Sequence, residues 1–347
     1  MGLKHNFKRL VDNYHITGSV PETAKSVFRE LTNPKRDRMP LPISAQIEPT
    51  TQCNFNCVMC ARKNLSTNRK NMWLTGEHFK SILDAIPTLK RVTLQGFGEP
   101  LLTPGLQELL DIGKGRKIRL VTFTNGSLLH IDRYADLAVQ FDDLVVSFDS
   151  IDKTTFESIR IGSDFDKIKE GMRKIDQLRK QRENKFVFII NFAASHLNYK
   201  DIPQLKEICL EAGIDSVIIS ELGNWYTPNE AEYAGEVEFV NKTRRISEEI
   251  RRNSDVLAAS LKPLGKKVFY VGHERRKPVC RWTFDNVFIS ADGYVTPCCA
   301  RMNPDVINFG NIYEEKFADI WNNKAMRDFR RSMIENTANP ICDNCPN

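Results

Sequence analysis

The sequence has no long hydrophobic run and no strong excess of charge of one sign. Its windows fall short of the ~18 to 20 uninterrupted apolar residues of a membrane span, and residues 1–25 lack the apolar core of a secretory signal. Fifty basic and 44 acidic residues leave a net charge of only +6 in 347 residues. These absences predict a cytoplasmic protein without membrane spans.

Basic clusters are also scarce. Two short stretches, residues 35–39 and 173–185, concentrate positive charge, but neither carries the interleaved aromatic residues on which single-stranded nucleic acid stacks. Solvated helix faces and loops account for both stretches, so no nucleic-acid partner is predicted. Apolar residues make up 41% of the chain, enough for a globular protein with a sizeable buried core.

Cysteine, in contrast, is abundant and unevenly distributed, with nine residues in all. In a reducing cytoplasm, so many thiols indicate metal or cluster ligands rather than disulfides. Three of them, Cys53, Cys57 and Cys60, stand in the stretch CNFNCVMC, and Cys209 stands alone. The remaining five lie in the last quarter of the chain: Cys280, Cys298, Cys299, Cys342 and Cys345.

Short β-rich runs alternate with amphipathic helical stretches between residues 43 and 220. Strands are expected at 43–48, 91–95, 118–123, 143–148, 185–192 and 216–220. Helices are expected at 75–87, 105–114, 163–182 and 202–213. This alternation indicates parallel strands joined by crossovers, and six such units predict an α/β fold in the form of a partial (β/α)6 barrel with an open side. Ligands would bind at the carboxyl ends of the strands.

The pattern changes after residue 221. A charged helix is expected over 238–252, and a hairpin-like segment over 286–298 lies inside the cysteine-rich region. We therefore expect three parts: an N-terminal helical extension over 1–41, a barrel over 42–255 and a small C-terminal domain over 256–347.

The loop Cys53-x3-Cys57-x2-Cys60 directly follows the first expected strand, so its three thiols would lie at the barrel mouth. A structural zinc site would need a nearby histidine or a fourth cysteine, and the next cysteine is Cys209. An iron–sulfur cube held by three cysteines instead keeps one iron open to a small molecule.

At these residues the chain resembles the radical SAM superfamily, whose hallmark is this CxxxCxxC loop on a partial (β/α)6 barrel. The resemblance implies a 4Fe-4S cluster on Cys53, Cys57 and Cys60, with S-adenosylmethionine (SAM) on the open iron, and a 5'-deoxyadenosyl radical that abstracts hydrogen from substrate. It also implies a flavodoxin- or ferredoxin-like electron donor. Met59 departs from the aromatic residue that often precedes the third cysteine, a position that contacts adenine largely through its backbone.

Further segments resemble SAM-contacting motifs of the family. GFGEP, at 96–100, matches the GGEP loop, in which glycines permit close approach and Glu99 would accept from the SAM ammonium; alone, it could be an ordinary turn. The resemblance assigns SAM contacts to eight residues: Gly96, Gly98, Glu99, Asn125, Ser147, Asp149, Arg160 and Asn191. From the residues themselves, turn capping is the alternative for Ser147 and Asp149, and a surface ion pair is the alternative for Arg160.

The C-terminal cysteines resemble the SPASM/Twitch extension of radical SAM enzymes, which carries auxiliary iron–sulfur clusters. The shorter Twitch form implies one 4Fe-4S cluster on Cys280, Cys298, Cys342 and Cys345, with Cys299 as a spare that could exchange with Cys298. The spacing is similar to that of 2-deoxy-scyllo-inosamine dehydrogenase. By ligand count alone, zinc would fit these four cysteines equally well.

The two predicted clusters indicate an oxidoreductase that dehydrogenates a small polar molecule, such as a sugar or cyclitol. A peptide-modifying maturase is the alternative, and for epimerisation Cys209 or Cys299 would have to reach the cavity. Cys209 lies on an apolar helix face and is expected to be a buried structural thiol. Trp225, Tyr226 and Tyr233 could line the open side or pack against the second domain. A non-catalytic iron–sulfur or zinc-binding module that associates with nucleic acid is an alternative from another functional class. Measurements of iron content and of SAM cleavage would distinguish it from an enzyme.

Overall fold

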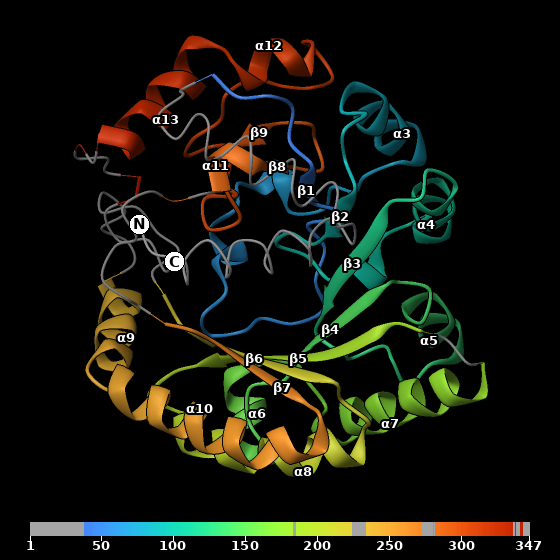
Figure 1. Cartoon of the computed structure of the whole chain (residues 1–347), viewed down its shortest axis with the longest axis vertical. Coiled ribbons are helices and arrows are strands. Elements are labelled where there is room, and N and C mark those ends of the chain that lie inside the picture. The colour runs from blue at the N-terminus through green and yellow to red at the C-terminus, as the bar shows by residue number, and fades with distance from the viewer. Residues whose placement is uncertain are drawn as a thin grey trace.

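One nine-stranded sheet organises the computed structural model, which describes residues 38–182, 185–223, 234–272, 280, 282–335, 337 and 341–342. The strand order is β7-β6-β5-β4-β3-β2-β1-β8-β9, and the sheet curves around a central space with its helices on the outside (Figure 1). The strands are β1 (Ser44–Ile47), β2 (Arg91–Leu94), β3 (Arg119–Thr124), β4 (Asp143–Ser147), β5 (Val187–Ala194), β6 (Ser216–Glu221), β7 (Lys267–Val271), β8 (Asn286–Ile289) and β9 (Val295–Thr296).

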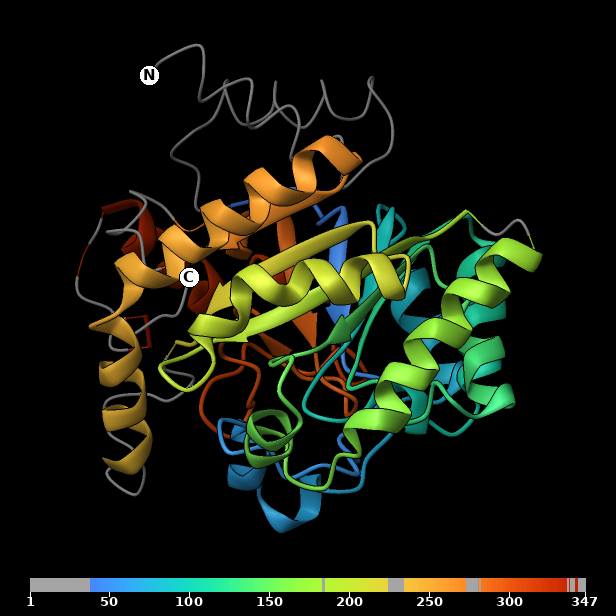
Figure 2. The same ribbon diagram turned by 90° about the horizontal axis from the view of Figure 1, so that it is seen from below.

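The six strands predicted from the sequence are confirmed, and each pairs in parallel with the next along the chain. Eight helices accompany the barrel strands in the described residues. They are α3 (Gly76–Ala85), α4 (Leu106–Gly115), α5 (Asp132–Ala138), α6 (Lys153–Ile159), α7 (Phe165–Gln181), α8 (Leu205–Glu211), α9 (Ala234–Arg244) and α10 (Ser247–Leu261). Figure 2 shows the long helices α7 and α10 lying across the outer side of the strands. The mostly parallel α/β fold is therefore confirmed.

Polar side chains define where several helices begin. Thr75 accepts a hydrogen bond from the His78 amide at the start of α3, and Asp152 accepts from the Thr155 amide at the start of α6. Asp164 caps α7 in the same way. Each cap satisfies an amide that has no partner within its helix, so these three residues stabilise the starts of α3, α6 and α7.

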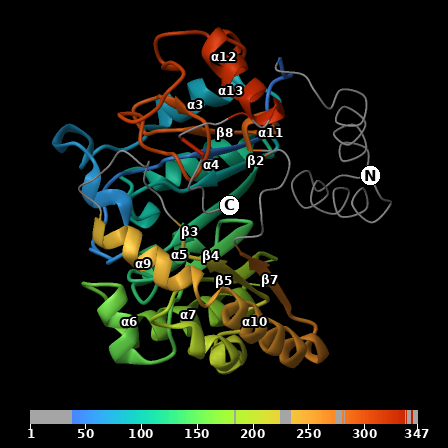
Figure 3. The ribbon, with the colours of Figure 1, turned by 90° about the vertical axis from the view of Figure 1, so that its left-hand side faces the viewer.

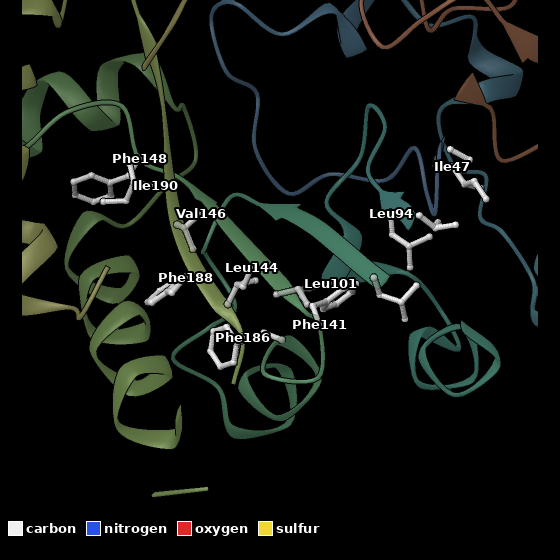
Figure 4. Packing of buried hydrophobic residues seen from close by; sticks show 14 of the residues in the cluster. Ile47, Leu94, Leu101, Phe141, Leu144, Val146, Phe148, Phe186, Phe188 and Ile190 are labelled. Carbon is white, nitrogen blue, oxygen red and sulfur yellow. The ribbon is translucent and has the colours of Figure 1, made fainter. Parts of the chain in front are cut away.

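The main core lies between the outer face of the sheet and these helices. Alternate strand residues point outward and are fully buried, among them Leu144 and Val146 of β4 and Phe188 and Ile190 of β5 (Figure 4). On the opposite face, Ser147 of β4 and Asn191 of β5 are partly exposed, while Val145 is buried. Because strand side chains alternate between faces, these partly exposed residues line the inner wall of the barrel.

A seventh parallel strand was missed by sequence reasoning. β7 pairs with β6 from Ser216↔Lys267 to Ser220↔Val271. It follows α10, which begins at Ser247 after α9 ends at Arg244, so the single charged helix expected here is two helices. Phe269 and Val271 of β7 are 46% and 40% exposed, and such a half-exposed edge strand gives only a weak hydrophobic signal.

The expected domain boundary at 255/256 falls inside α10 and is therefore wrong. Residues of α10, including the buried Leu257 and Leu261, contact β6, β7 and α8. The barrel elements continue to Val271, and the SPASM-like cysteines begin at Cys280. We propose a boundary between these two residues, because a helix that packs on barrel strands folds with the barrel.

The C-terminal part comprises α11 (Trp282–Asp285), β8, β9, α12 (Phe317–Trp321) and α13 (Lys324–Glu335). β8 and β9 form the expected antiparallel hairpin. β8 also pairs in parallel with β1, from Ser44↔Asn286 to Ile47↔Ile289, and α12 and α13 lie above it in Figure 3, at the opposite end of the molecule from α7 and α10. The two parts of the chain therefore share one hydrogen-bonded sheet.

The basic helix α7 is paired with acidic side chains rather than left free. Arg173 contacts Glu211 at 2.6 Å, and Arg179 contacts Asp215 at 2.6 Å and Asp176 at 3.1 Å. These basic side chains of α7 therefore take part in ion pairs on the helix surface. In the described residues, no helix is both long and apolar enough to cross a membrane.

Arg330 joins the elements of the C-terminal part. Its guanidinium is fully buried, donates to the carbonyls of Thr283 (2.7 Å) and Trp321 (2.8 Å), and lies 4.1 Å from the centre of the Trp321 ring. The indole of Trp321 in turn donates to the carbonyl of Pro40 at 2.8 Å, which ties the segment before β1 to this part.

We expect Arg330→Met to lower the free energy of unfolding by about 3 kcal/mol, because it leaves two buried carbonyls without donors. Arg331→Met, at an exposed neighbouring position, should change it by less than about 0.5 kcal/mol. Urea denaturation of both variants would measure this, and equal stabilities would contradict the role given to Arg330.

Candidate functional site

The cysteine loop leaves the carboxyl end of β1 and is held by backbone hydrogen bonds to the segment after α6. The Asn56 amide donates to the Ile161 carbonyl at 2.8 Å, and the Val58 amide donates to the Ile159 carbonyl at 3.0 Å. Gly162 has φ of +94°, and a Cβ there would lie 3.2 Å from the Asn54 carbonyl oxygen. The turn over residues 160–163 therefore anchors the loop that carries the three cysteines.

The thiols of Cys53, Cys57 and Cys60 are partly buried and close enough to influence one another. The pKa of Cys57 is raised to about 12, mainly by burial and in part by negative charge on Cys60 and Cys53. The Arg160 guanidinium acts in the opposite direction on the pKa of both Cys57 and Cys60. Thiolates are the ligating form, so three thiols that cannot ionise together without nearby positive charge suit a cluster whose iron ions bind them as anions.

In the described residues, no three His, Cys, Asp or Glu side chains are arranged around a single metal ion. A cubane binds each cysteine through a different iron, so its ligands need not converge on one point. The donor set of three thiols on one loop thus fits an iron–sulfur cluster with one open iron.

Arg160 forms an ion pair with Asp149 at 2.6 Å, and both side chains are buried. The Ala193 amide of β5 also donates to Asp149, at 2.8 Å. The alternative of a surface ion pair is therefore wrong in one respect, because the pair is internal. A buried positive charge beside two cysteine ligands would stabilise a cluster of net negative charge.

The GFGEP loop approaches the backbone just before the cysteines. The Gly98 amide donates to the Thr50 carbonyl at 3.1 Å, and the Glu99 amide donates to the Gln52 carbonyl at 2.7 Å. A Cβ on Gly98 would lie 2.4 Å from the Thr50 oxygen and 2.5 Å from the Gln52 oxygen. Only glycine permits this approach, which brings the predicted SAM loop against the cluster loop.

Glu99 is 2% exposed and connects its loop to the turn over residues 124–126 at the end of β3. Its Oε1 accepts from Thr124 Oγ1 (2.7 Å) and the Leu101 amide (3.1 Å), and its Oε2 accepts from the Asn125 amide (2.6 Å). Burial raises the pKa of Glu99, and these hydrogen bonds lower it. A carboxylate oxygen accepts two donors, so Oε2 retains capacity for the predicted ammonium group. That SAM contact stays a prediction.

Asn125 reaches the cysteine loop directly. Its Nδ2 donates to Asn54 Oδ1 at 2.9 Å and lies 3.9 Å from Cys53 Sγ, while its Oδ1 accepts from the Ser127 amide at 2.9 Å. The structure thus brings together Cys53, Glu99 and Asn125, which are 72 residues apart at most.

Ser147 and Asn191 lie farther along the inner wall, on β4 and β5. Ser220 of β6 donates to Asn191 Oδ1 at 3.2 Å. Gln46 of β1 and Thr93 of β2 occupy the equivalent inner face on the other side. The wall therefore presents neutral amides and hydroxyls from five strands.

In the auxiliary part, Arg301 links two of the cysteine-bearing segments. Its Nε donates to the Ile341 carbonyl at 2.6 Å, and its amide donates to the Cys298 carbonyl at 3.2 Å. Ile341 directly precedes Cys342. Cys280, Cys298, Cys299 and Cys342 are all partly exposed. Cys345 and the aromatic residues Trp225, Tyr226 and Tyr233 lie outside the described residues, so their predicted roles stay predictions.

Cys209 is confirmed as a buried thiol. It is 0% exposed, sits on α8 within the hydrophobic core, and has its pKa raised by burial to about 12. The core lies on the outer face of the sheet, so this thiol cannot donate hydrogen into the barrel interior.

Two charged residues at the site were missed by sequence reasoning. Glu48 directly follows β1 and is 0% exposed, and Arg69 ends the short helix η2 (Thr67–Arg69) and is 4% exposed. The available signal for Glu48 was a carboxylate immediately after an apolar strand and before a ligand loop. No sequence pattern pointed to Arg69, because Glu48 and Asp292, its partners, are distant from it in sequence. Gly96 packs against the Glu48 side chain, because a Cβ there would lie 2.3 Å from Glu48 Cγ, and its SAM contact stays a prediction.

This fold and this cysteine loop define a radical SAM enzyme with an auxiliary cluster domain, and the comparisons agree. Residues 47–209 match the family model of the Radical SAM superfamily, and residues 280–346 match the SPASM iron–sulfur cluster-binding domain. The chain therefore carries a radical SAM domain followed by a C-terminal SPASM domain. Together the two domains imply SAM and two iron–sulfur clusters as cofactors.

Among curated proteins, the chain is similar to the tungsten-containing aldehyde ferredoxin oxidoreductase cofactor-modifying protein of Pyrococcus furiosus. The two are 27% identical over 326 residues, which cover 86% of each chain. A probable GTP 3',8-cyclase of Methanocaldococcus jannaschii is 25% identical over 273 residues, covering 74% of this chain and 85% of the relative.

Among solved structures, Streptococcus suis SuiB bound to S-adenosylmethionine has a TM-score of 0.68 at 17% identity, covering 90% of this chain and 73% of SuiB. The structure of anSMEcpe with bound AdoMet has a TM-score of 0.64 at 16% identity, covering 84% of each chain. These likenesses confirm the fold.

We expect Gly98→Ala to weaken SAM binding by at least about tenfold, because the added methyl group would push the GFGEP loop away from the backbone at Thr50 and Gln52. Gly115→Ala is the matched control, since a Cβ there meets nothing within 4 Å. Equilibrium dialysis with labelled SAM, at equal iron content per chain, would measure both. Unchanged binding in Gly98→Ala would disprove the close-approach argument.

Proposed function

We propose that this enzyme dehydrogenates a small, polar, hydroxyl-bearing molecule and uses the auxiliary 4Fe-4S cluster as the electron acceptor. When bound, SAM and the first cluster supply a 5'-deoxyadenosyl radical that removes a hydrogen atom, and the auxiliary cluster takes up the electron released when the substrate radical loses a proton. Cys53, Cys57 and Cys60 would hold the first cluster, and Cys280, Cys298, Cys342 and Cys345 the second.

The observation that carries this proposal is the contact between the auxiliary part and the inner wall of the barrel. The Gln46 amide of β1 lies 3.8 Å from Met302 Sδ and also donates to the Gln95 carbonyl at 3.2 Å. Met302 lies three residues after Cys299. The turn that carries Cys298 and Cys299 therefore comes near the space in which a substrate radical would form, and electron transfer requires such proximity.

The chemistry of the inner wall supports a polar, uncharged substrate. Thr93, Ser147, Asn191 and Ser220 offer hydroxyl and amide groups that donate and accept hydrogen bonds, as a polyol would require. These groups are partly exposed and so are accessible to a ligand. A ligand with several hydroxyl groups could exchange hydrogen bonds with such a wall in place of water.

The curated relatives also support a small molecule. Their names refer to a cofactor and to GTP, and their similarity extends over 86% and 74% of this chain. One of the similar solved structures is SuiB bound to the precursor peptide SuiA, but at 17% identity that likeness concerns the fold. A peptide is therefore the competing substrate class in the test below.

The chain's own side chains would orient the reacting groups. Glu99 would receive the SAM ammonium on Oε2, while Arg160, held by Asp149, would keep positive charge beside Cys57 and Cys60. A flavodoxin- or ferredoxin-like protein in the cytoplasm would be the electron donor.

Cluster content tests the two ligand sets. After anaerobic reconstitution, the wild type should contain about eight irons per chain, as two cubanes require. Cys280→Ala/Cys342→Ala should retain about four irons and still form 5'-deoxyadenosine from SAM, while Cys53→Ala/Cys57→Ala should retain about four and form none. Cys209→Ala, the control thiol, should match the wild type. A tightly held zinc in place of the second cluster would refute the electron-acceptor role.

Hydrogen transfer tests the substrate class. Deuterated polyols, cyclitols and sugars, and in parallel deuterated peptides, would be incubated with the reduced enzyme and SAM, and deuterium in 5'-deoxyadenosine would be measured by mass spectrometry. We expect transfer from a hydroxyl-bearing carbon of a small molecule and a product two hydrogens lighter. Transfer only from a peptide, or a product of unchanged mass, would reject the proposed dehydrogenation.

A further inference from the structure

Glu48 is a buried carboxylate at which three loops meet. Its Oε1 accepts from the Phe97 amide of the GFGEP loop at 2.9 Å. Its Oε2 accepts from the Ala291 amide at 3.3 Å, in the turn between β8 and β9 of the auxiliary domain. The Glu48 side chain therefore contacts both the SAM loop and the auxiliary domain. Glu48 also begins the segment that leads to Cys53, Cys57 and Cys60.

Arg69 adds ion pairs to both Glu48 and the auxiliary turn. Its Nη2 lies 3.5 Å from Glu48 Oε2, and its Nη1 is paired with Asp292 of the same auxiliary turn. Both Arg69 and Glu48 are at most 4% exposed. Burial raises the pKa of Glu48 to about 7, and the positive charge of Arg69 opposes that rise. Removing the charge of any one of Glu48, Arg69 and Asp292 would therefore leave a buried charge without full compensation.

The auxiliary turn is held in place from its own side as well. Ser290 Oγ donates to Asp292 Oδ1 at 2.6 Å, and Asn311 Nδ2 donates to the Asp292 carbonyl at 3.0 Å. Tyr313 stacks on His78 of α3, with ring centroids 4.1 Å apart. A displacement of the turn would therefore be passed to Asp292 and from there to Arg69 and Glu48.

The SAM loop is the other end of this chain of contacts. Gly96 lies directly on the Glu48 side chain, so the loop cannot shift without moving Glu48 or losing the Phe97 hydrogen bond. Two residues later, Gly98 and Glu99 bind the backbone at Thr50 and Gln52. The position of Glu48 thus determines the position of the loop in which Glu99 stands.

We propose that Glu48, Arg69 and Asp292 are positioning residues that couple SAM binding to the order of the auxiliary-domain turn over residues 290–293. SAM would be bound more tightly when the turn is in place, and by reciprocity SAM would order the turn. This inference rests on the SAM site and on the three contacts, and it is independent of the substrate and of the proposed dehydrogenation.

The first test uses the reconstituted, unreduced full chain, so that SAM binds without being cleaved. Asp292→Asn, which leaves the GFGEP loop and all cysteines untouched, should raise the Kd for SAM about tenfold, a value within the usual range for coupled sites. Arg69→Gln should do the same, and the double variant should be no worse than either single variant, because both break one network. Asp319→Asn, an exposed acid on α12, is the matched control.

A Kd for Asp292→Asn equal to that of the wild type, at about eight irons per chain, would overturn the coupling. Additive losses in the double variant would also overturn it, since independent destabilisation of two parts adds.

The second test needs no variant and therefore remains decisive if a variant fails to fold. In the wild-type holoenzyme, saturating SAM should slow hydrogen exchange at the Ala291 and Gly293 amides about tenfold, while the amides of α13 in the same domain keep their rates. No slowing at residues 291–293, or equal slowing in α13, would overturn the proposal. Neither result would touch the iron content or the hydrogen-transfer outcome on which the proposed function depends.

Discussion

The pairing of β1 on both of its edges is the constraint on which the other parts of this structure depend. β2 lies on one side and β8 on the other, and both run parallel to β1 in the same register. β8 comes from the auxiliary domain, about 240 residues later in the chain. A strand with no free edge cannot slip, so the cysteine loop that follows β1 starts from one defined point.

From that point, glycine and hydrogen bonds bring the catalytic loops together. Gly98 allows the second loop to touch the first, and Glu99 connects the second to the third through Thr124 and Asn125. Asn125 then returns to the first loop at Asn54. The result is a closed ring of contacts around the candidate SAM site, in which each loop is supported by two others. Such a preorganised arrangement limits the reorganisation needed when the cofactor binds.

Two buried ion pairs lie where this ring meets its surroundings. Arg160 and Asp149 form one pair beside Cys57 and Cys60, and Glu48 and Arg69 form another beside the auxiliary turn. Burying charges is costly unless they are paired, so such pairs seldom contribute much net stability. Their value here lies in geometry and electrostatics: one pair places positive charge near the cluster ligands, and the other connects two domains.

Much of the fold and part of the site could be predicted from the sequence. The six barrel strands are short β-rich runs separated by amphipathic helical stretches, and the three-cysteine loop is contiguous, so both depend on local sequence alone. β7 was not predicted from the sequence, because about half of its side chains are exposed at the edge of the sheet. The boundary at 255/256 failed because the amphipathic pattern of α10 does not say which strands it covers.

The amino-acid sequence by itself determined much of the chemistry of the protein: the ligand loop and the glycine-rich loop are each contiguous, and the second cysteine set lies within residues 280–345. Only the tertiary structure decided how these parts act on one another. The partners of Glu48 are Phe97, Arg69 and Ala291, and no periodic pattern in a chain relates positions separated by up to 243 residues. They meet because β8 pairs with β1, and strand pairing over such a distance is settled by the folding of the whole sheet.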